Sequence, residues 1–172
     1  MPLLPKSGDC MTQPAAPVPA FEYAMKILSK RSYAESEVRT KLKKKNYPAE
    51  EIENAITECK RYSFINDEMY ARDYAAILNA RGCGKLLIRR KLAMLKIDEN
   101  FIEAALAETA DSEFEAAKRS FDFKMRMLER EKNPFKKRQK LYAFMVNRGY
   151  SFDIIRQLLD DINLNMENDC NE

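Results

Sequence analysis

The sequence contains no histidine among its 172 residues, and this absence removes the side chain that most often serves as a general base in enzymes. It also removes the usual partner that activates a serine or cysteine nucleophile. Carboxylates and lysines could still carry chemistry, but they lie in helical patterns typical of solvated faces. We therefore expect no enzymatic activity.

Closely spaced cysteines are also absent. The four cysteines, Cys10, Cys59, Cys83 and Cys170, are far apart and form no CxxC pair. Structural zinc requires neighbouring thiolates or imidazoles, so we expect no metal site. The simplest interpretation is reduced thiols in a cytoplasmic protein.

Long apolar runs are missing as well. No segment approaches the roughly 20 apolar residues that a helix needs to span a bilayer, so we expect no membrane association. Residues 1–20 contain one basic residue and no long apolar core, unlike a signal peptide or an anchor. Their proline, alanine and serine content predicts a disordered leader. The whole chain, with 33% charged and 45% hydrophobic residues, has a globular composition.

The segment RGCGKLLIRRKL, residues 81–92, combines glycines with a lysine, as phosphate-binding loops do. A P-loop needs two glycines separated by four residues, then Lys and Ser or Thr, between a strand and a helix. Here one residue separates Gly82 from Gly84, and a leucine follows Lys85. The preceding residues have helical spacing, so no strand leads into the glycines. A turn between two helices is the better interpretation.

The chain repeats itself with a period of about 50 residues. Residues 31–56 align without a gap with residues 81–106, and a further shift of 53 residues brings in a third segment. Five apolar positions coincide in the three segments: Val38, Leu42, Tyr47, Ile52 and Ile56; Ile88, Leu92, Ile97, Ile102 and Leu106; Leu141, Met145, Tyr150, Ile155 and Leu159. Each unit has the spacing of three helices. We therefore expect an all-α fold of three tandem three-helix repeats that form an elongated, curved array.

The predicted repeats cover residues 21–66, 67–111 and 112–163, and an acidic tail covers residues 164–172. A unit of about 50 residues buries too little apolar surface to be stable alone. Stacking of neighbouring units is therefore the expected source of stability.

Turn residues mark the ends of the predicted helices. The second helices should end near Asn46, Lys96 and Gly149, and Asn and Gly suit a left-handed C-terminal cap. Asp98 and Ser151 are candidate N-caps of third helices. Pro48 suits the first turn of the third helix in the first unit.

Basic residues gather in the second helix of every unit, whereas the third helices are acidic. The candidate partner-binding residues are Arg39, Lys41, Lys43, Lys44, Lys45, Lys85, Arg89, Arg90, Lys91, Lys136, Lys137, Arg138 and Lys140. Each run alone could be an ordinary solvated face. Three runs at matching positions indicate a basic ridge for a polyanionic partner, either nucleic acid or an acidic protein surface. The accompanying acidic ridge argues against a protein that binds only DNA.

Four segments within residues 21–162 have a specific order and spacing: RSYAESEVRTKL, INDEMYARDY, GCGKLLIRRKL and KKRQKLYAFMVNRGYSFDII. In these segments the chain resembles the RecX family of bacterial regulators of the RecA recombinase. It implies a protein that binds RecA, usually within the groove of its filament on DNA. It also implies restraint of the ATPase, strand-exchange and co-protease activities of RecA, without enzymatic activity or a cofactor. We expect a monomer that contacts DNA weakly, if at all.

Individual residues match the recurring positions of that family, and most of them look structural: Gly82, Gly84, Ile88, Leu92, Arg148, Gly149 and Tyr150. Asn46 departs from the pattern, because the family often has glycine there, and residues 1–20 match nothing in it. Two other functions remain open at this point. One is a helical DNA-binding protein that uses its basic second helices, although helix-turn-helix modules usually read DNA with the helix after the turn, which is acidic here. The other is a scaffold without any connection to nucleic acid.

Overall fold

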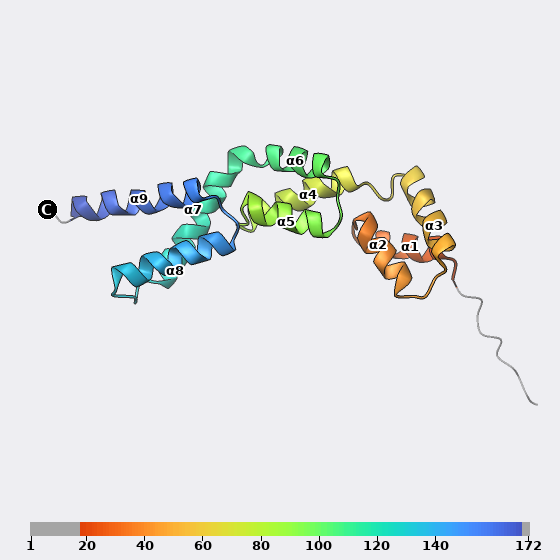
Figure 1. Cartoon of the computed structure of the whole chain (residues 1–172), viewed down its shortest axis with the longest axis horizontal. Helices are drawn as coiled ribbons and strands as arrows, with labels where there is room; N and C mark the ends of the chain where they lie inside the picture. The colour runs from red at the N-terminus through yellow and green to blue at the C-terminus, as the bar shows by residue number, and fades with distance from the viewer. Residues whose placement is uncertain (1–17, 170–172) are drawn as a thin grey trace, which may run out of the picture.

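The computed structural model of the chain describes residues 18–169, with side chains as far as residue 160. These residues form nine α-helices and no strand: α1 (Ala20–Leu28), α2 (Glu35–Lys43), α3 (Ala49–Arg61), α4 (Asp67–Ala80), α5 (Lys85–Met94), α6 (Glu99–Glu108), α7 (Ala110–Met127), α8 (Pro134–Asn147) and α9 (Phe152–Asp169). Successive triplets of helices form three units of an elongated, curved array (Figure 1). The predicted all-α fold of three tandem three-helix repeats is confirmed.

The helix bounds show where the predicted segments lie. Ala20, the last residue of the predicted leader, begins α1 and is buried, whereas residues 1–17 lie outside the described residues. Helix α7 begins at Ala110, two residues before the predicted third repeat. The backbone of α9 remains helical to Asp169, through most of the predicted acidic tail, and residues 170–172 are not described.

Each unit has its own apolar core, and the repeated positions form it. All of the coincident apolar residues are buried except Tyr47, which is half-buried and donates its hydroxyl to the Val18 carbonyl at 2.6 Å. Leu42, Leu92 and Met145 are completely buried at the centres of the three cores. The apolar residues that repeat along the sequence are therefore core residues and not surface residues.

The second helices end in the same turn in all three units. Asn46, Lys96 and Gly149 have positive φ angles of 60°, 58° and 81°. In each unit the next amide donates to a carbonyl of the last helical turn, on Leu42, Leu92 or Met145. This is the Schellman arrangement, and it confirms the left-handed caps predicted at Asn46 and Gly149; Lys96 adopts the same conformation.

The third helices begin nearly as predicted. The Asp98 carboxylate accepts the amide of Asn100 at 2.9 Å, and the Ser151 hydroxyl accepts the amide of Ile154 at 3.5 Å. Pro48, expected inside the first turn of α3, instead precedes the helix, which begins at Ala49. Its carbonyl still accepts the first helical bond, from the amide of Ile52 at 3.1 Å.

The joint between the first and second units is polar. At the N-terminus of α2, the Glu35 amide donates to the Asp67 carboxylate of α4 at 2.9 Å. One residue later, the Ser36 hydroxyl donates to the Leu95 carbonyl, just after α5 ends. The first turn of α2 thus contacts both the beginning of α4 and the end of α5, and the Glu35 amide, which has no acceptor within α2, finds one in the next unit.

The joint between the second and third units repeats this design. At the N-terminus of α5, the Lys85 amide donates to the Glu113 carboxylate of α7 at 2.9 Å. The Leu86 amide donates to the Gly149 carbonyl, at the end of α8, at 3.1 Å. Helices α2 and α5 therefore each contact, in the following unit, a carboxylate from the first helix and a carbonyl at the end of the second helix.

Glycine allows the two backbones to meet at this second joint. A Cβ atom on Gly84 would lie 2.4 Å from the Gly149 carbonyl oxygen, and one on Gly149 would lie 2.3 Å from the Leu87 amide nitrogen. The Gly84 amide donates to the Arg148 carbonyl at 2.8 Å. The glycine-rich segment is therefore the predicted turn between helices. Its amides bind protein acceptors and are not available to a phosphate.

The first joint yields a testable prediction at Asp67. Replacing Asp67 with alanine should lower the free energy of unfolding by about 1–3 kcal/mol, because the Glu35 amide loses its acceptor. The Asp67→Asn variant keeps an acceptor and is the matched control. Urea denaturation followed by circular dichroism measures both variants, and equal stability of the two would contradict the role assigned to this bond.

The parent and the Asp67→Asn variant should also differ in their pH dependence. Burial raises the pKa of Asp67 from 3.8, aided by the nearby Glu35 carboxylate and opposed by the Glu35 amide and by Lys60. The folded state therefore binds the Asp67 proton more tightly than the unfolded state does. The stability that this proton contributes is present at low pH and is lost as the pH rises through the folded pKa. The stability of Asp67→Asn relative to the parent should rise from about pH 3 to pH 7. A constant difference across this range would contradict the prediction.

Candidate partner-binding surface

The candidate basic residues lie on α2, α5 and α8 or in the turns at their ends. Figure 1 shows α5 and α8 along the lower edge of the array, with α6 and α9 above them. Each unit thus contributes basic residues, and the positive charge extends along the array.

Two of the candidate arginines serve the fold. Arg39 pairs with Glu35 on its own helix at 2.8 Å and with Glu53 on α3. Arg89, 50 residues later, pairs with Glu99 at 3.1 Å and with Glu103, both on α6. These arginines connect the second helix of a unit to its third helix. The predicted basic and acidic ridges are therefore joined by ion pairs at these two places.

Two candidate lysines are also paired. The Lys85 ammonium lies 3.2 Å from the Glu113 carboxylate at the second joint. The Lys140 ammonium lies 2.6 Å from Glu131, and the pKa of that carboxyl is lowered, chiefly by the bond to Lys140. Both positive charges are compensated within the chain.

The other candidates form no ion pair with a described residue, and we call them the unpaired cations. Lys41 and Lys45 lie 4.8 and 6.0 Å from the ring centroids of Tyr33 and Tyr23, respectively, which leaves their charge uncompensated. The unpaired cations are Lys41, Lys43, Lys44, Lys45, Arg90, Lys91, Lys136, Lys137 and Arg138. They are the part of the predicted basic surface that can attract an anionic partner.

The sequence did not indicate the two carboxylates at the joints between units, those of Asp67 and Glu113. Asp67 lies 32 residues after Glu35, whereas Glu113 lies 28 residues after Lys85. Because the two separations differ, the repeat alignment gives no signal for this pairing. Only the packing of first helices on second helices shows that these two carboxylates are equivalent.

Residues 18–160, whose side chains are described, contain no group of three or more His, Cys, Asp or Glu side chains that could bind a metal ion. Cys59 and Cys83 are buried free thiols, while Cys10 and Cys170 lie outside the described residues. Burial raises the pKa of Cys59, and Glu58 adds to the effect. Among the described helices, none is long and apolar enough to cross a membrane.

Comparison with known proteins identifies the family. The family model for "RecX, first three-helix domain" matches residues 20–59, and that for "RecX, third three-helix domain" matches residues 111–159. A "Regulatory protein RecX" of Haemophilus influenzae (strain 86-028NP) is 30% identical over 141 residues, covering 81% of this chain and 92% of the relative. The chain belongs to the RecX family.

Other RecX proteins agree with this result. The "Regulatory protein RecX" of Vibrio vulnificus (strain CMCP6) is 32% identical over 142 residues, covering 80% of this chain and 89% of the relative. A crystal structure of regulatory protein RecX has a TM-score of 0.73 and 26% identity, covering 82% of this chain and 70% of that one. RecX from Lactobacillus salivarius has a TM-score of 0.70 at 23% identity, covering 84% and 95%, and supports the fold. The relatives are named as regulatory proteins rather than as enzymes.

Proposed function

We propose that this RecX-family protein binds the RecA recombinase filament on DNA and inhibits its ATPase, strand-exchange and co-protease activities. In this way it modulates recombination and DNA repair. The observation that carries the proposal is the family match, in which relatives named regulatory protein RecX align with this chain over more than 80% of its length. The protein acts as a cytoplasmic monomer, without a cofactor and without catalysing a reaction.

The geometry is consistent with a filament as the target. A filament repeats its subunits along an axis, and an elongated array can contact more than one of them. The unpaired cations on α2, α5 and α8 supply charge along the array, and they attract DNA phosphates or acidic patches on RecA. Such contacts predict that affinity falls as salt rises, because exposed charges are screened over about 8–10 Å near physiological ionic strength.

The ATPase activity of RecA tests the proposal. Titrating the protein into RecA assembled on single-stranded DNA with ATP should lower the steady-state ATPase rate in a saturable way. Heat-denatured protein at the same concentrations is the control. An unchanged ATPase rate at saturating protein would contradict the proposed function.

A second candidate function is direct DNA binding. It is favoured by Lys43, Lys44 and Lys45, three consecutive exposed lysines without an ion pair to a described residue. If bonds to phosphates dominate, naked single-stranded DNA should bind as tightly as the filament does. Each lysine substitution that removes one phosphate neighbour should then lower the slope of log affinity against log salt by about 0.7 on single-stranded DNA. Weak binding to naked DNA would favour RecA as the principal partner.

A further inference from the structure

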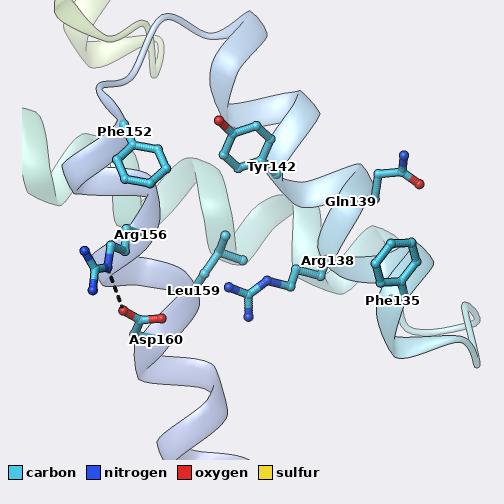
Figure 2. Close-up of a pocket in the computed structure, with 8 residues that line it drawn as sticks. All are labelled: Phe135, Arg138, Gln139, Tyr142, Phe152, Arg156, Leu159 and Asp160. Carbon is cyan, nitrogen blue, oxygen red and sulfur yellow. Dashed lines mark ion pairs between the residues drawn. The ribbon is translucent and has the colours of Figure 1, made fainter.

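The third unit has a groove between α8 and α9. Among the described residues, only residues of the third unit line it. Its volume is about 360 Å³. Figure 2 shows the rings of Phe135, Tyr142 and Phe152 on the two helices, with Arg138 reaching toward Leu159 and Arg156 beside Asp160 on α9. These rings are 76%, 41% and 61% exposed. The end of a repeat array normally needs a polar outer face, so exposed aromatic residues here require an explanation.

The repeat supplies a counterpart of this groove in the second unit. Six residues of the third-unit groove, Arg138, Gln139, Tyr142, Arg156, Leu159 and Asp160, each lie 53 residues after one residue of the other set: Lys85, Leu86, Arg89, Glu103, Leu106 and Ala107. That second set lines a groove between α5 and α6. The two grooves are therefore the same face of successive units.

The second-unit groove is partly covered by the third unit. Glu113 and Ser151 complete its lining, and the Glu113 carboxylate both accepts the Lys85 amide and pairs with the Lys85 ammonium. In the first unit, the same end of α2 receives the Asp67 carboxylate through the amide of Glu35. In both joints, then, the first turn of a second helix receives a carboxylate from the first helix of the next unit.

The residues of the third-unit groove differ from their counterparts in a way that suits an external partner. In the second unit, Arg89 is held by Glu99 and Glu103. Their counterparts 53 residues later are Tyr142, Phe152 and Arg156. An internal ion-pair network is thereby replaced by two exposed rings and an arginine, a composition typical of protein interfaces.

The positive charge of this groove is little compensated. Arg138 forms no ion pair with a described residue. Arg156 pairs with Asp160 on the next turn of α9 at 3.5 Å, and the two side chains are 70% and 50% exposed. An exposed pair of this kind contributes little and can rearrange around an incoming carboxylate.

We propose that the third-unit groove binds a helix of a RecA filament subunit that presents a carboxylate beside an apolar side chain. Its carboxylate lies beside Arg138 as the Glu113 carboxylate of α7 lies beside Lys85, the counterpart of Arg138 in the second unit. The carboxylate pairs with Arg138 and Arg156, while the apolar side chain packs among the three rings. This inference rests on the proposed function, because it assigns the groove to the same partner. The proposed contact between the two proteins resembles the contact between the second and third units.

Three full-length proteins test the inference: the parent, a groove variant (Arg138→Glu with Arg156→Glu) and a control variant (Arg126→Glu with Arg130→Glu). The control makes the same charge change at exposed positions in the same unit, outside the groove. Binding to RecA filaments on single-stranded DNA and to naked DNA is measured by fluorescence anisotropy. Circular dichroism melting establishes that all three fold, and sedimentation gives the oligomeric state.

The groove variant should bind filaments at least about tenfold more weakly than the parent, whereas the control should change less than about twofold. Naked-DNA binding should respond equally to the two variants. A fourth protein, Phe152→Ala, should also weaken filament binding, but with the salt dependence of the parent, because it removes an apolar ring and no charge.

The possible failures can be distinguished. Filament binding that is equal in parent and groove variant overturns the inference and leaves the proposed function standing. A parent that does not bind filaments overturns both. If the groove variant loses naked-DNA binding in the same proportion as filament binding, the groove contacts phosphates. If the parent self-associates and the groove variant does not, a second copy of the chain is the occupant. Either result overturns the assignment to a RecA helix.

Discussion

Replacing Leu92 with alanine is expected to lower the free energy of unfolding by about 2–5 kcal/mol. Leu92 is completely buried in the core of the second unit, at the position that Leu42 and Met145 occupy in the other units. Truncation removes buried apolar atoms and leaves a cavity that the short helices around it can only partly close. Urea denaturation monitored by circular dichroism measures the change in stability.

Leu86→Ala is the matched control on the same helix. Leu86 is 60% exposed, so its truncation should change stability by less than about 1 kcal/mol. If the Leu92 variant unfolds at the same urea concentration as the parent, the alignment of the repeats is wrong at this position.

The Leu92→Ala substitution should also affect the neighbouring units, because the second unit lies between the other two. Both polar joints include α5: its end receives Ser36, and its beginning donates to Glu113 and Gly149. Loosening α5 should therefore weaken the joints on both sides, as expected where each repeat is stabilised by its neighbours. Hydrogen exchange should show faster exchange in the first turns of α2 as well as in α5.

Reversing the charge of Lys43, Lys44 and Lys45 to glutamate should weaken RecA inhibition at least about tenfold, equivalent to about 1.4 kcal/mol. These lysines are exposed and unpaired within the described residues, so their charge is available to a partner. The half-maximal inhibitory concentration in the RecA ATPase assay measures the effect. Melting curves check the fold, because acidic residues at the end of α2 oppose the helix dipole.

The matched control reverses Lys26, Lys30 and Arg61, which are exposed in the same unit but lie outside the second helix. The control should inhibit RecA nearly as well as the parent does. Equal effects of the two triple substitutions would show that net charge, and not the position of the unpaired cations, governs inhibition.

Arg89 is unsuited to a charge-reversal test, although the sequence makes it a candidate partner-binding residue like its neighbours Arg90 and Lys91. Reversing its charge would place three acidic side chains together, because Arg89 contacts Glu99 and Glu103. Weaker inhibition would then report a disturbed packing of α5 on α6. Arg90, exposed and unpaired within the described residues, is the better choice in the second unit.

The fold could be predicted from the sequence because the core positions repeat. Leu42, Leu92 and Met145 occupy the same position in the three units, and all three are buried. The same arrangement of three helices therefore buries the repeated apolar residues in every unit. Alignment with Asn46 and Gly149 predicted that the second helix of the second unit ends near Lys96. It did not predict the positive φ of Lys96, because lysine has no preference for that conformation.

The pairing of charges could not be predicted in the same way. Arg39 and Glu53 are 14 residues apart and meet because α2 and α3 pack together, which the helical spacing of charges does not reveal. The third-unit groove was missed for a related reason. Tyr142 and Phe152 read as ordinary helix residues until the structure shows that their counterparts, Arg89 and Glu99, form an ion pair.

Binding of the labelled protein to RecA filaments on single-stranded DNA tests the central claim most directly. Fluorescence anisotropy at about 0.15 M salt with ATP would compare the filament with the same DNA free of RecA. The account predicts saturable binding to the filament that is at least about tenfold tighter than binding to naked DNA. No binding to the filament, or equal affinity for filament and naked DNA, would contradict it.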